Sequence, residues 1–477
     1  MRDQYIQLIK DYINKTPQYK NTLDELKKNV LIAGATEKEF EEALLEVEAG
    51  GQNTGTKTLL SRLKSKKTVF ALASLLFLIL IPGIIFLTSN LNKQKTTEAP
   101  VVVNPQNQDD KIGSFPIIYA NTTPIDAKKV FSIPSDNVKL DFTGKPKKEI
   151  LGFFPYWMLD TQDKIILSDL SSIAIFGLEI NGKGEIVTVT EDGKVDPGWS
   201  MWRDENLDVL IRRAKSQGLK VYLTFKSFTN SNIESLSLSD DAQKTFIANT
   251  SYLVNSRNLD GVNIDFEYTG QSNDNLRDGF LRLVKNLNAE LKRQNPKSIL
   301  TIDTYLVSGA EQGLFNLTLL SPYTDAFVIM GYDIHTPLGD PGPISAMGGD
   351  TNVIGYVQNY LEKVSEDKLI LAVPYYGYDW PEKKDDQVST KILAIAQINE
   401  AVKNTQVYWD DNSQTPFYKY SEEGVQRVVH FDNVRSLAIK YDFINKKNLK
   451  GVGIWALGYD GLNSDLHKLL IDKFIVQ

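Results

Sequence analysis

Short apolar runs alternate with longer amphipathic segments from residue 149 to the C-terminus. Between the runs, apolar residues recur at helical spacing, as over 207–217 and 275–294, which predicts helices. Strands that alternate with helices in this way are typical of a (β/α)₈ barrel, the TIM barrel, and an open doubly wound sheet is the alternative. The eight predicted strands are 150–156, 172–178, 220–225, 261–266, 299–305, 326–330, 369–374 and 451–456.

An uncharged, largely apolar run occupies residues 68–87. Its length suits a helix that crosses a bilayer, at about 1.5 Å of rise per residue. Basic residues are denser before the run, at 57–67, than after it, at 88–95. By the positive-inside tendency we expect a single-pass membrane protein with a cytoplasmic N-terminus and an extracytoplasmic catalytic domain.

The segments on either side of this run differ in character. Residues 1–50 contain short amphipathic stretches, two of which begin with capping-box patterns at 22–25 and 36–39. They predict a small helical module without a chemical motif, which we expect to be a spacer or to bind a cytoplasmic protein partner. Residues 88–148 are polar and contain several prolines, which predicts a linker.

The composition narrows the chemistry that the chain can perform. It has 0 Cys and 3 His, so disulfides and thiolate chemistry are excluded and a histidine-rich metal site is not expected. The net charge of −7 gives no reason to expect nucleic-acid binding. All 6 Trp lie between residues 157 and 455, inside the predicted barrel. Carboxylates and aromatic rings are therefore the candidate functional groups, with no metal or cofactor.

The fourth predicted strand carries the clearest polar pattern. Side chains alternate between the two faces of a strand, so Asn263, Asp265 and Glu267 share one face. A half-exposed strand would present such residues to water, but a parallel strand flanked by helices is normally covered on both faces. Polar groups inside a barrel are costly unless they are hydrogen-bonded or functional. The pattern therefore predicts a site at the C-terminal end of this strand, where barrel enzymes carry their chemistry.

The motifs together resemble glycoside hydrolase family 18, the chitinase family. The stretch 260–267, DGVNIDFE, is similar to the family's DxxDxDxE signature, and 330–333, MGYD, is similar to its M-x-Y-D motif on strand six. Asn263 stands where many chitinases have Asp, a variant typical of the branch that includes spore-cortex and other peptidoglycan-cleaving N-acetylglucosaminidases. The resemblance covers residues 149–477 and implies a small α+β insertion at 379–433, between strands seven and eight.

The resemblance also implies substrate-assisted catalysis, in which the acetamido oxygen of the substrate attacks the anomeric carbon with net retention. Glu267 would protonate the leaving oxygen and then activate water. Asp265 would bind the acetamido N–H and stabilise the oxazolinium ion, and Asn263 would hydrogen-bond Asp265. Tyr332 would hold the acetamido oxygen, and Asp333 would bind the same group or the sugar ring.

Other residues are expected to contact the sugar or to support the strand. Asp260 and Gly261, at the start of the fourth strand, are expected to be structural. The expected substrate contacts are Tyr156, Trp157, Met330, Tyr375, Tyr376, Trp380 and Trp455.

We therefore expect a membrane-anchored hydrolase of a polysaccharide that contains β-linked N-acetylglucosamine. Peptidoglycan, chitin and N-glycan cores all offer the required acetamido sugar, and the sequence leaves these substrates open. A carbohydrate-binding membrane protein without catalysis is the alternative. Lectin-like members of the family typically lose the acid that stands here as Glu267.

Overall fold

The structure is a computed structural model, and the predicted N-terminal elements lie outside the residues that it describes. These elements are the helical module at 1–50 and the apolar run at 68–87. The described residues are 124–133, 140, 142, 144–309, 313–383 and 389–475.

The expected membrane localisation is not upheld. In the part of the chain that the structure describes, no helix combines the length and the apolar character that a bilayer crossing requires. A span needs about 20 apolar residues in one helix. Among the residues that the structure describes, no helix therefore supports the expected single-pass localisation.

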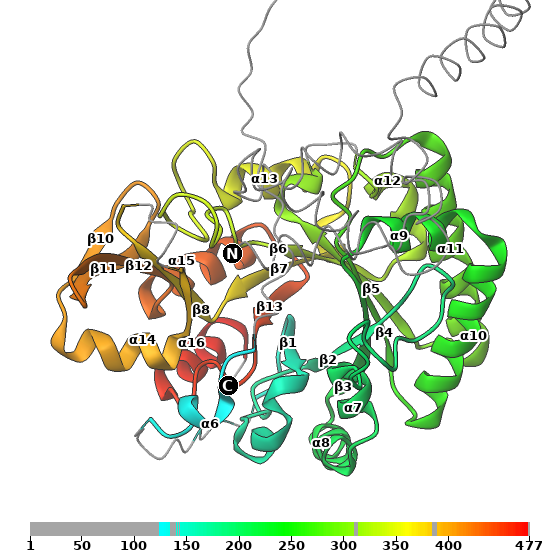
Figure 1. Ribbon diagram of the computed structural model, residues 1–477, viewed down its shortest axis with the longest axis horizontal. Coiled ribbons are helices and arrows are strands. Elements are labelled where there is room, and N and C mark those ends of the chain that lie inside the picture. Colours follow the sequence, from blue (N-terminus) through cyan, green and yellow to red (C-terminus); the bar gives the residue numbers. More distant parts are fainter. Residues whose placement is uncertain are drawn as a thin grey trace, which may run out of the picture. The chain divides into compact units, whose positions relative to one another are not determined.

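Eight parallel strands close into a barrel in the order β1-β13-β7-β6-β5-β4-β3-β2 (Figure 1). This order confirms the predicted (β/α)₈ barrel, because an open doubly wound sheet would leave two edges unpaired. The strands coincide with the predicted apolar runs to within two residues at each end. The barrel strands are β1 (Glu149–Pro155), β2 (Ser172–Glu179), β3 (Lys220–Ser227), β4 (Gly261–Phe266), β5 (Ile299–Tyr305), β6 (Ala326–Met330), β7 (Leu369–Pro374) and β13 (Gly451–Trp455).

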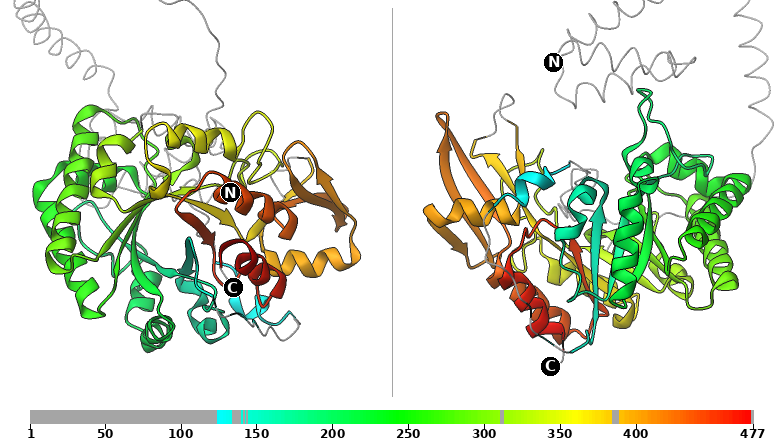
Figure 2. Two further views of the ribbon diagram at one scale, coloured as in Figure 1. Left: turned by 180° about the vertical axis from the view of Figure 1, so that it is seen from behind. Right: turned by 90° about the horizontal axis from the view of Figure 1, so that it is seen from below.

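Amphipathic helices cover the outside of the barrel (Figure 2). In the helix over 274–294, for example, Phe280, Leu283 and Leu287 recur at helical spacing and are buried. Asn273 caps this helix by accepting a hydrogen bond from the Leu276 N–H at 2.9 Å. The longer helices are α7 (Pro197–Trp202), α8 (Glu205–Ser216), α9 (Asn230–Leu238), α10 (Asp240–Ser256), α11 (Asp274–Gln294), α13 (Val353–Leu361), α15 (Val434–Lys446) and α16 (Ser464–Phe474).

Single-turn helices and 3₁₀ turns complete the connections between the strands. Tyr156, predicted as the end of the first strand, instead begins a 3₁₀ helix. These short elements are α6 (Ala127–Val130), η2 (Tyr156–Lys164), η3 (Leu306–Gly309), α12 (Leu317–Leu320), η4 (Ser321–Tyr323) and η5 (Glu366–Lys368).

Part of the predicted linker packs onto the barrel domain. Within 124–133, Asp126 caps α6, and Ile125 and Val130 are buried in the main hydrophobic core. Lys164 of η2 lies over the Phe131 ring at 5.5 Å. Burial of these apolar side chains stabilises the contact, so this stretch is part of the folded domain and not a tether.

Between β7 and β13 the chain forms a second, antiparallel sheet beside the barrel, in the order β10-β11-β12-β8-β9 (Figure 1). A buried ion pair joins two of its strands, with Arg427 Nε 2.8 Å from Asp379 Oδ1. Its elements are β8 (Tyr376–Pro381), β9 (Lys391–Ala394), α14 (Ile395–Ala401), η6 (Val402–Asn404), β10 (Val407–Asp410), β11 (Thr415–Glu422) and β12 (Val425–Phe431).

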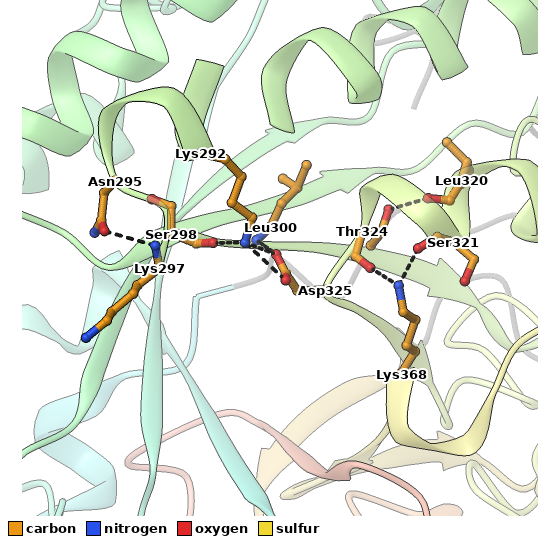
Figure 3. Close-up of polar contacts among 10 residues, drawn as sticks. All are labelled: Lys292, Asn295, Lys297, Ser298, Leu300, Leu320, Ser321, Thr324, Asp325 and Lys368. Carbon is orange, nitrogen blue, oxygen red and sulfur yellow. Dashed lines mark hydrogen bonds and ion pairs between the residues drawn. The ribbon is translucent and has the colours of Figure 1, made fainter. Parts of the chain in front are cut away.

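Lysine contacts tie together the N-terminal ends of β5, β6 and β7 (Figure 3). Lys292 of α11 lies 3.1 Å from Asp325, and Asp325 also accepts a hydrogen bond from the Leu300 N–H at 2.8 Å. Lys368 donates to the carbonyl of Thr324 at 2.8 Å. This end of the barrel serves stability, which leaves the C-terminal ends of the strands for chemistry.

Candidate active site

The alternation of β4 sends apolar side chains outward and polar ones into the barrel. Phe266 packs outward, with its ring 6.1 Å from Phe246 of α10 and 6.3 Å from Phe280 of α11. On the opposite face, Asn263 is 0% exposed and Asp265 is 3% exposed. Glu267, directly after the strand, is 2% exposed. The three predicted polar residues therefore lie at the inner, C-terminal end of β4.

Asn263 makes its hydrogen bonds to the two neighbouring strands and not along its own strand. Its Nδ2 donates to Asp303 Oδ2 at 2.8 Å, and its Oδ1 accepts from Thr301 Oγ1 at 2.6 Å. Both of these partners lie on β5, and Nδ2 also donates to Thr224 Oγ1 on β3 at 3.4 Å. The expected hydrogen bond between Asn263 and Asp265 is therefore wrong, because the Asn263 amide bonds to inward groups on β3 and β5 instead.

Asp265 is buried and lies opposite the cationic side chain of Lys226. Burial raises its pKa to about 7, and the charge of Lys226 opposes this rise. Lys226 stands directly opposite Asp265 in the register of β3 and β4. The Lys226 ammonium is itself held by Glu179 of β2, at 2.7 Å. A nearby cation favours the ionised form of Asp265.

Tyr332 follows β6 and meets the carboxylates of the site. Burial and the charges of Asp303, Asp333, Asp265 and Glu267, in that order, raise its pKa well above the usual value. Its phenol therefore stays protonated and can donate a hydrogen bond.

Asp333 is oriented by two tyrosines from the second sheet. Tyr376 and Tyr378 of β8 each donate a hydrogen bond to its Oδ1, at 2.5 Å and 2.8 Å. Burial raises the pKa of Asp333 to about 6, although both hydrogen bonds lower it. Its φ of 58° lies in the left-handed region, which Asp tolerates better than most residues. Tyr376, predicted to contact substrate, thus meets Asp333 in this structure.

An aromatic cluster brings together residues of β2 and of the C-terminal ends of β1 and β13. The Trp455 ring, at the end of β13, is 4.7 Å from Phe176 and 6.3 Å from Trp157. Trp157 donates from its indole nitrogen to the Tyr459 hydroxyl at 3.2 Å, and Tyr156 packs edge-on against it at 4.7 Å. Tyr156 and Trp157 are partly exposed, whereas Trp455 is 5% exposed.

Two expected substrate contacts face other parts of the fold. Tyr375 is 3% exposed, and its hydroxyl meets that of Tyr441 in α15 at 3.2 Å. Trp380 is 1% exposed and donates to the Thr336 carbonyl at 3.1 Å. The polar groups of both rings therefore bond within the fold, and their role as substrate contacts stays a prediction. Met330, at the end of β6, is partly exposed.

The first residues of the β4 motif lie at the opposite, N-terminal end of the strand. Asp260 accepts a hydrogen bond from the Val221 N–H at 2.9 Å and lies 3.7 Å from the Lys215 ammonium. A Cβ at Gly261 would stand 2.2 Å from the Ile299 carbonyl oxygen, so only glycine fits against β5. Both residues support strand pairing.

The sequence reasoning missed three charged residues of the site: Asp303, Lys226 and Glu179. The alternation of the fifth predicted strand could have found Asp303, since Thr301, Asp303 and Tyr305 share its inward face. Among the described residues, no group of three His, Asp or Glu side chains could hold a metal ion. The arrangement offers a buried carboxyl group for proton transfer, a second carboxylate beside a cation, and a phenol donor.

The comparison with protein families decides the identity of this domain. The model described as glycosyl hydrolases family 18 matches residues 149–460. The chain belongs to glycosyl hydrolase family 18. It is a glycoside hydrolase related to spore cortex-lytic enzymes and chitinases, which confirms the resemblance seen in its motifs.

Relatives of this family 18 hydrolase are distant in sequence. The chain is 26% identical over 299 residues to YdhD of Bacillus subtilis, named as a sporulation-specific glycosylase, with 60% of this chain and 66% of that protein covered. It is also 26% identical over 299 residues to mouse di-N-acetylchitobiase, with 57% and 76% covered. The crystal structure of the Bacillus megaterium spore cortex-lytic enzyme SleL matches with a TM-score of 0.56 at 19% identity, over 72% of this chain and 76% of that one. That likeness shows a shared fold.

Proposed function

We propose that this chain is a retaining hydrolase that cleaves β-linked N-acetylglucosamine polysaccharide by substrate-assisted catalysis, with peptidoglycan as its substrate. The observation that carries the proposal is the grouping of Glu267, Asp265 and Tyr332 at the C-terminal end of the barrel. The sporulation and cortex-lytic relatives favour peptidoglycan over chitin, as does Asn263 in the β4 motif.

The proposed reaction begins with proton transfer from Glu267 to the glycosidic oxygen, which leaves with the bonding electron pair. The acetamido carbonyl oxygen attacks the anomeric carbon, and an oxazolinium ion forms. Asp265 accepts the acetamido N–H and stabilises the positive charge on this ion. The Tyr332 hydroxyl donates to the acetamido oxygen and holds it in the attacking position.

In the second half of the reaction, water attacks the anomeric carbon from the face that the leaving group occupied. Glu267 removes a proton from this water and is restored to its acid form. Two displacements at one carbon retain the anomeric configuration. Asp333 binds the acetamido group or the sugar ring, and Tyr376 orients Asp333. Trp455, Trp157, Tyr156 and Met330 line the sugar site.

The test is product analysis with the full-length chain. Purified peptidoglycan and chitin are digested separately, and mass spectrometry identifies the released saccharides. From peptidoglycan we expect fragments that end in reducing N-acetylglucosamine. In a separate measurement, proton NMR of the early products of chitooligosaccharide cleavage should show the β-anomer. E267Q should lower turnover by about 10²–10⁴-fold. The matched exposed variant E400Q should leave turnover unchanged.

Each of the other outcomes contradicts part of the proposal. Release from chitin alone would replace the substrate, and an α-anomer product would exclude retention. Binding of chitooligosaccharides without any release would favour the carbohydrate-binding alternative.

A further inference from the structure

The active site contains a carboxylate on β5 that the family motifs of the sequence do not include. Asp303 is 5% exposed and points into the barrel. In the register of β4 and β5, Asn263 stands opposite Thr301. Because side chains alternate, Asp265 and Asp303 occupy the next inward positions of the two neighbouring strands. Two buried carboxyl groups therefore lie side by side.

In the described part of the chain, one oxygen of each carboxyl group in this pair lacks a hydrogen-bond partner. Asp303 Oδ2 accepts from the Asn263 amide at 2.8 Å. The Oδ1 atoms of Asp265 and Asp303 are both buried and have no hydrogen-bond partner in the described part of the chain. Two ionised carboxylates could only accept, so both atoms would stay unsatisfied and the charges would repel. One proton on the pair supplies the missing donor.

The surrounding charges decide which carboxyl group holds that proton. Lys226 stands opposite Asp265 across β3 and β4, and this cation favours an ionised Asp265. Burial and the charge of Asp265 raise the pKa of Asp303 well above its usual value, against the effect of the Asn263 hydrogen bond. The other titratable groups around the pair are Glu179 on β2, Glu267 after β4, Tyr305 on β5, and Tyr332 and Asp333 after β6.

We propose that Asp303 is a positioning residue of this site, which holds a proton and donates it in a hydrogen bond to Asp265. This hydrogen bond keeps Asp265 ionised and fixes its orientation toward the acetamido group, so the role rests on the proposed function. Asn263 on β4 has an amide and therefore no titratable proton to share with Asp265. Asp303 on the neighbouring β5 supplies this proton instead.

The decisive variant is D303N, because an amide has the shape and the neutral charge of a protonated carboxyl. Its oxygen can accept from Asn263, and its NH₂ group can donate to Asp265. D303L removes both hydrogen bonds at similar size. D442N makes the same substitution at an exposed aspartate that pairs with Lys473, and it is the matched control.

We expect the pH–rate profile of D303N on a chitooligosaccharide to superimpose on that of the wild type. D303L should lose turnover by about 10–100-fold, as for the loss of a hydrogen bond to a charged group. If Asp303 is instead ionised at working pH, D303N removes a negative charge beside Glu267, and the whole profile moves to lower pH. That shift would overturn the proposal, as would equal losses in D303N and D303L.

Thermal unfolding provides a readout that needs no turnover. A carboxyl whose pKa is raised in the folded state makes the protein less stable as pH rises above the pKa of the unfolded chain. The Tm of D303N relative to the wild type should therefore increase by roughly 2–4 °C or more between pH 4 and pH 7. A difference that stays constant with pH, as expected for D442N, would refute a proton on Asp303. If the wild type cleaves no glycan, the proposed function fails while this measurement still decides the charge of Asp303.

Discussion

Removal of the cation beside Asp265 should change the pH at which the enzyme becomes active. Lys226 is 8% exposed, stands opposite Asp265 on the neighbouring strand and is held by Glu179 at 2.7 Å. The variant K226Q removes the positive charge, while its glutamine can still donate a hydrogen bond to Glu179. Glu179 therefore keeps a hydrogen-bond partner, and the main change is electrostatic.

The magnitude follows from the geometry of adjacent strands. Strands lie about 4.8 Å apart, so a charge separation of ~6 Å is a reasonable value for opposed side chains. At an effective dielectric constant of ~20, two unit charges at this distance interact by ~3 kcal/mol, or ~2 pKa units. The negative charge of Glu179 offsets part of this effect. We expect the pKa of Asp265 to rise by about one unit in K226Q.

The assay is the pH dependence of kcat/KM on a fluorogenic chitooligosaccharide. Loss of a cation raises the pKa of a carboxyl, so Asp265 stays protonated to higher pH and the acid limb moves up by about one unit. K194Q removes an exposed lysine that pairs with Asp192 and should leave the limb in place. An unmoved acid limb in folded K226Q would show that Lys226 does not control Asp265, and a shift to lower pH would reverse the reasoning.

Two further predictions concern the buried His467 of α16 and Tyr376, which donates to Asp333. His467 lies 2.6 Å from Asp169 and 2.9 Å from Asp460, and against the lowering effect of burial these carboxylates raise its pKa to about 10. H467Q leaves the carboxylates without a counter-charge, so it should lose about 3–5 kcal/mol of stability. The raised pKa contributes stability below pH 6.5 that disappears as pH rises through 10. The Tm gap between wild type and variant should therefore narrow over that range, and a constant gap would contradict a charged His467. Y376F removes one hydrogen-bond donor from Asp333, which should weaken sugar binding and raise KM by about tenfold. Steady-state kinetics measure this effect, and an unchanged KM would show that Asp333 does not need the Tyr376 hydrogen bond.

The strands and the polar face of β4 could be predicted from the sequence because they depend on short-range periodicity. Alternation with a period of two places Asn263, Asp265 and Glu267 on one face wherever the strand lies. Apolar runs between amphipathic segments predict barrel strands by the same local reasoning. The bounds of all eight barrel strands agree with the prediction to within two residues.

The partners of each side chain were decided by tertiary structure. Asn263 bonds to Asp303 and Thr301, which are distant in sequence, because barrel closure sets the register of β4 against β5. Tyr375 and Trp380 look like sugar contacts in sequence, but packing turns them toward Tyr441 and Thr336.

The sequence by itself thus determined which residue types stand on the inward face of each strand, since that depends only on neighbours along the chain. The charge and hydrogen bonding of the site arise between strands. Lys226 from β3 and Asp303 from β5 flank Asp265 only after the barrel has closed. Electrostatic energy depends on distance in space and on burial, and the barrel register sets both for these three residues.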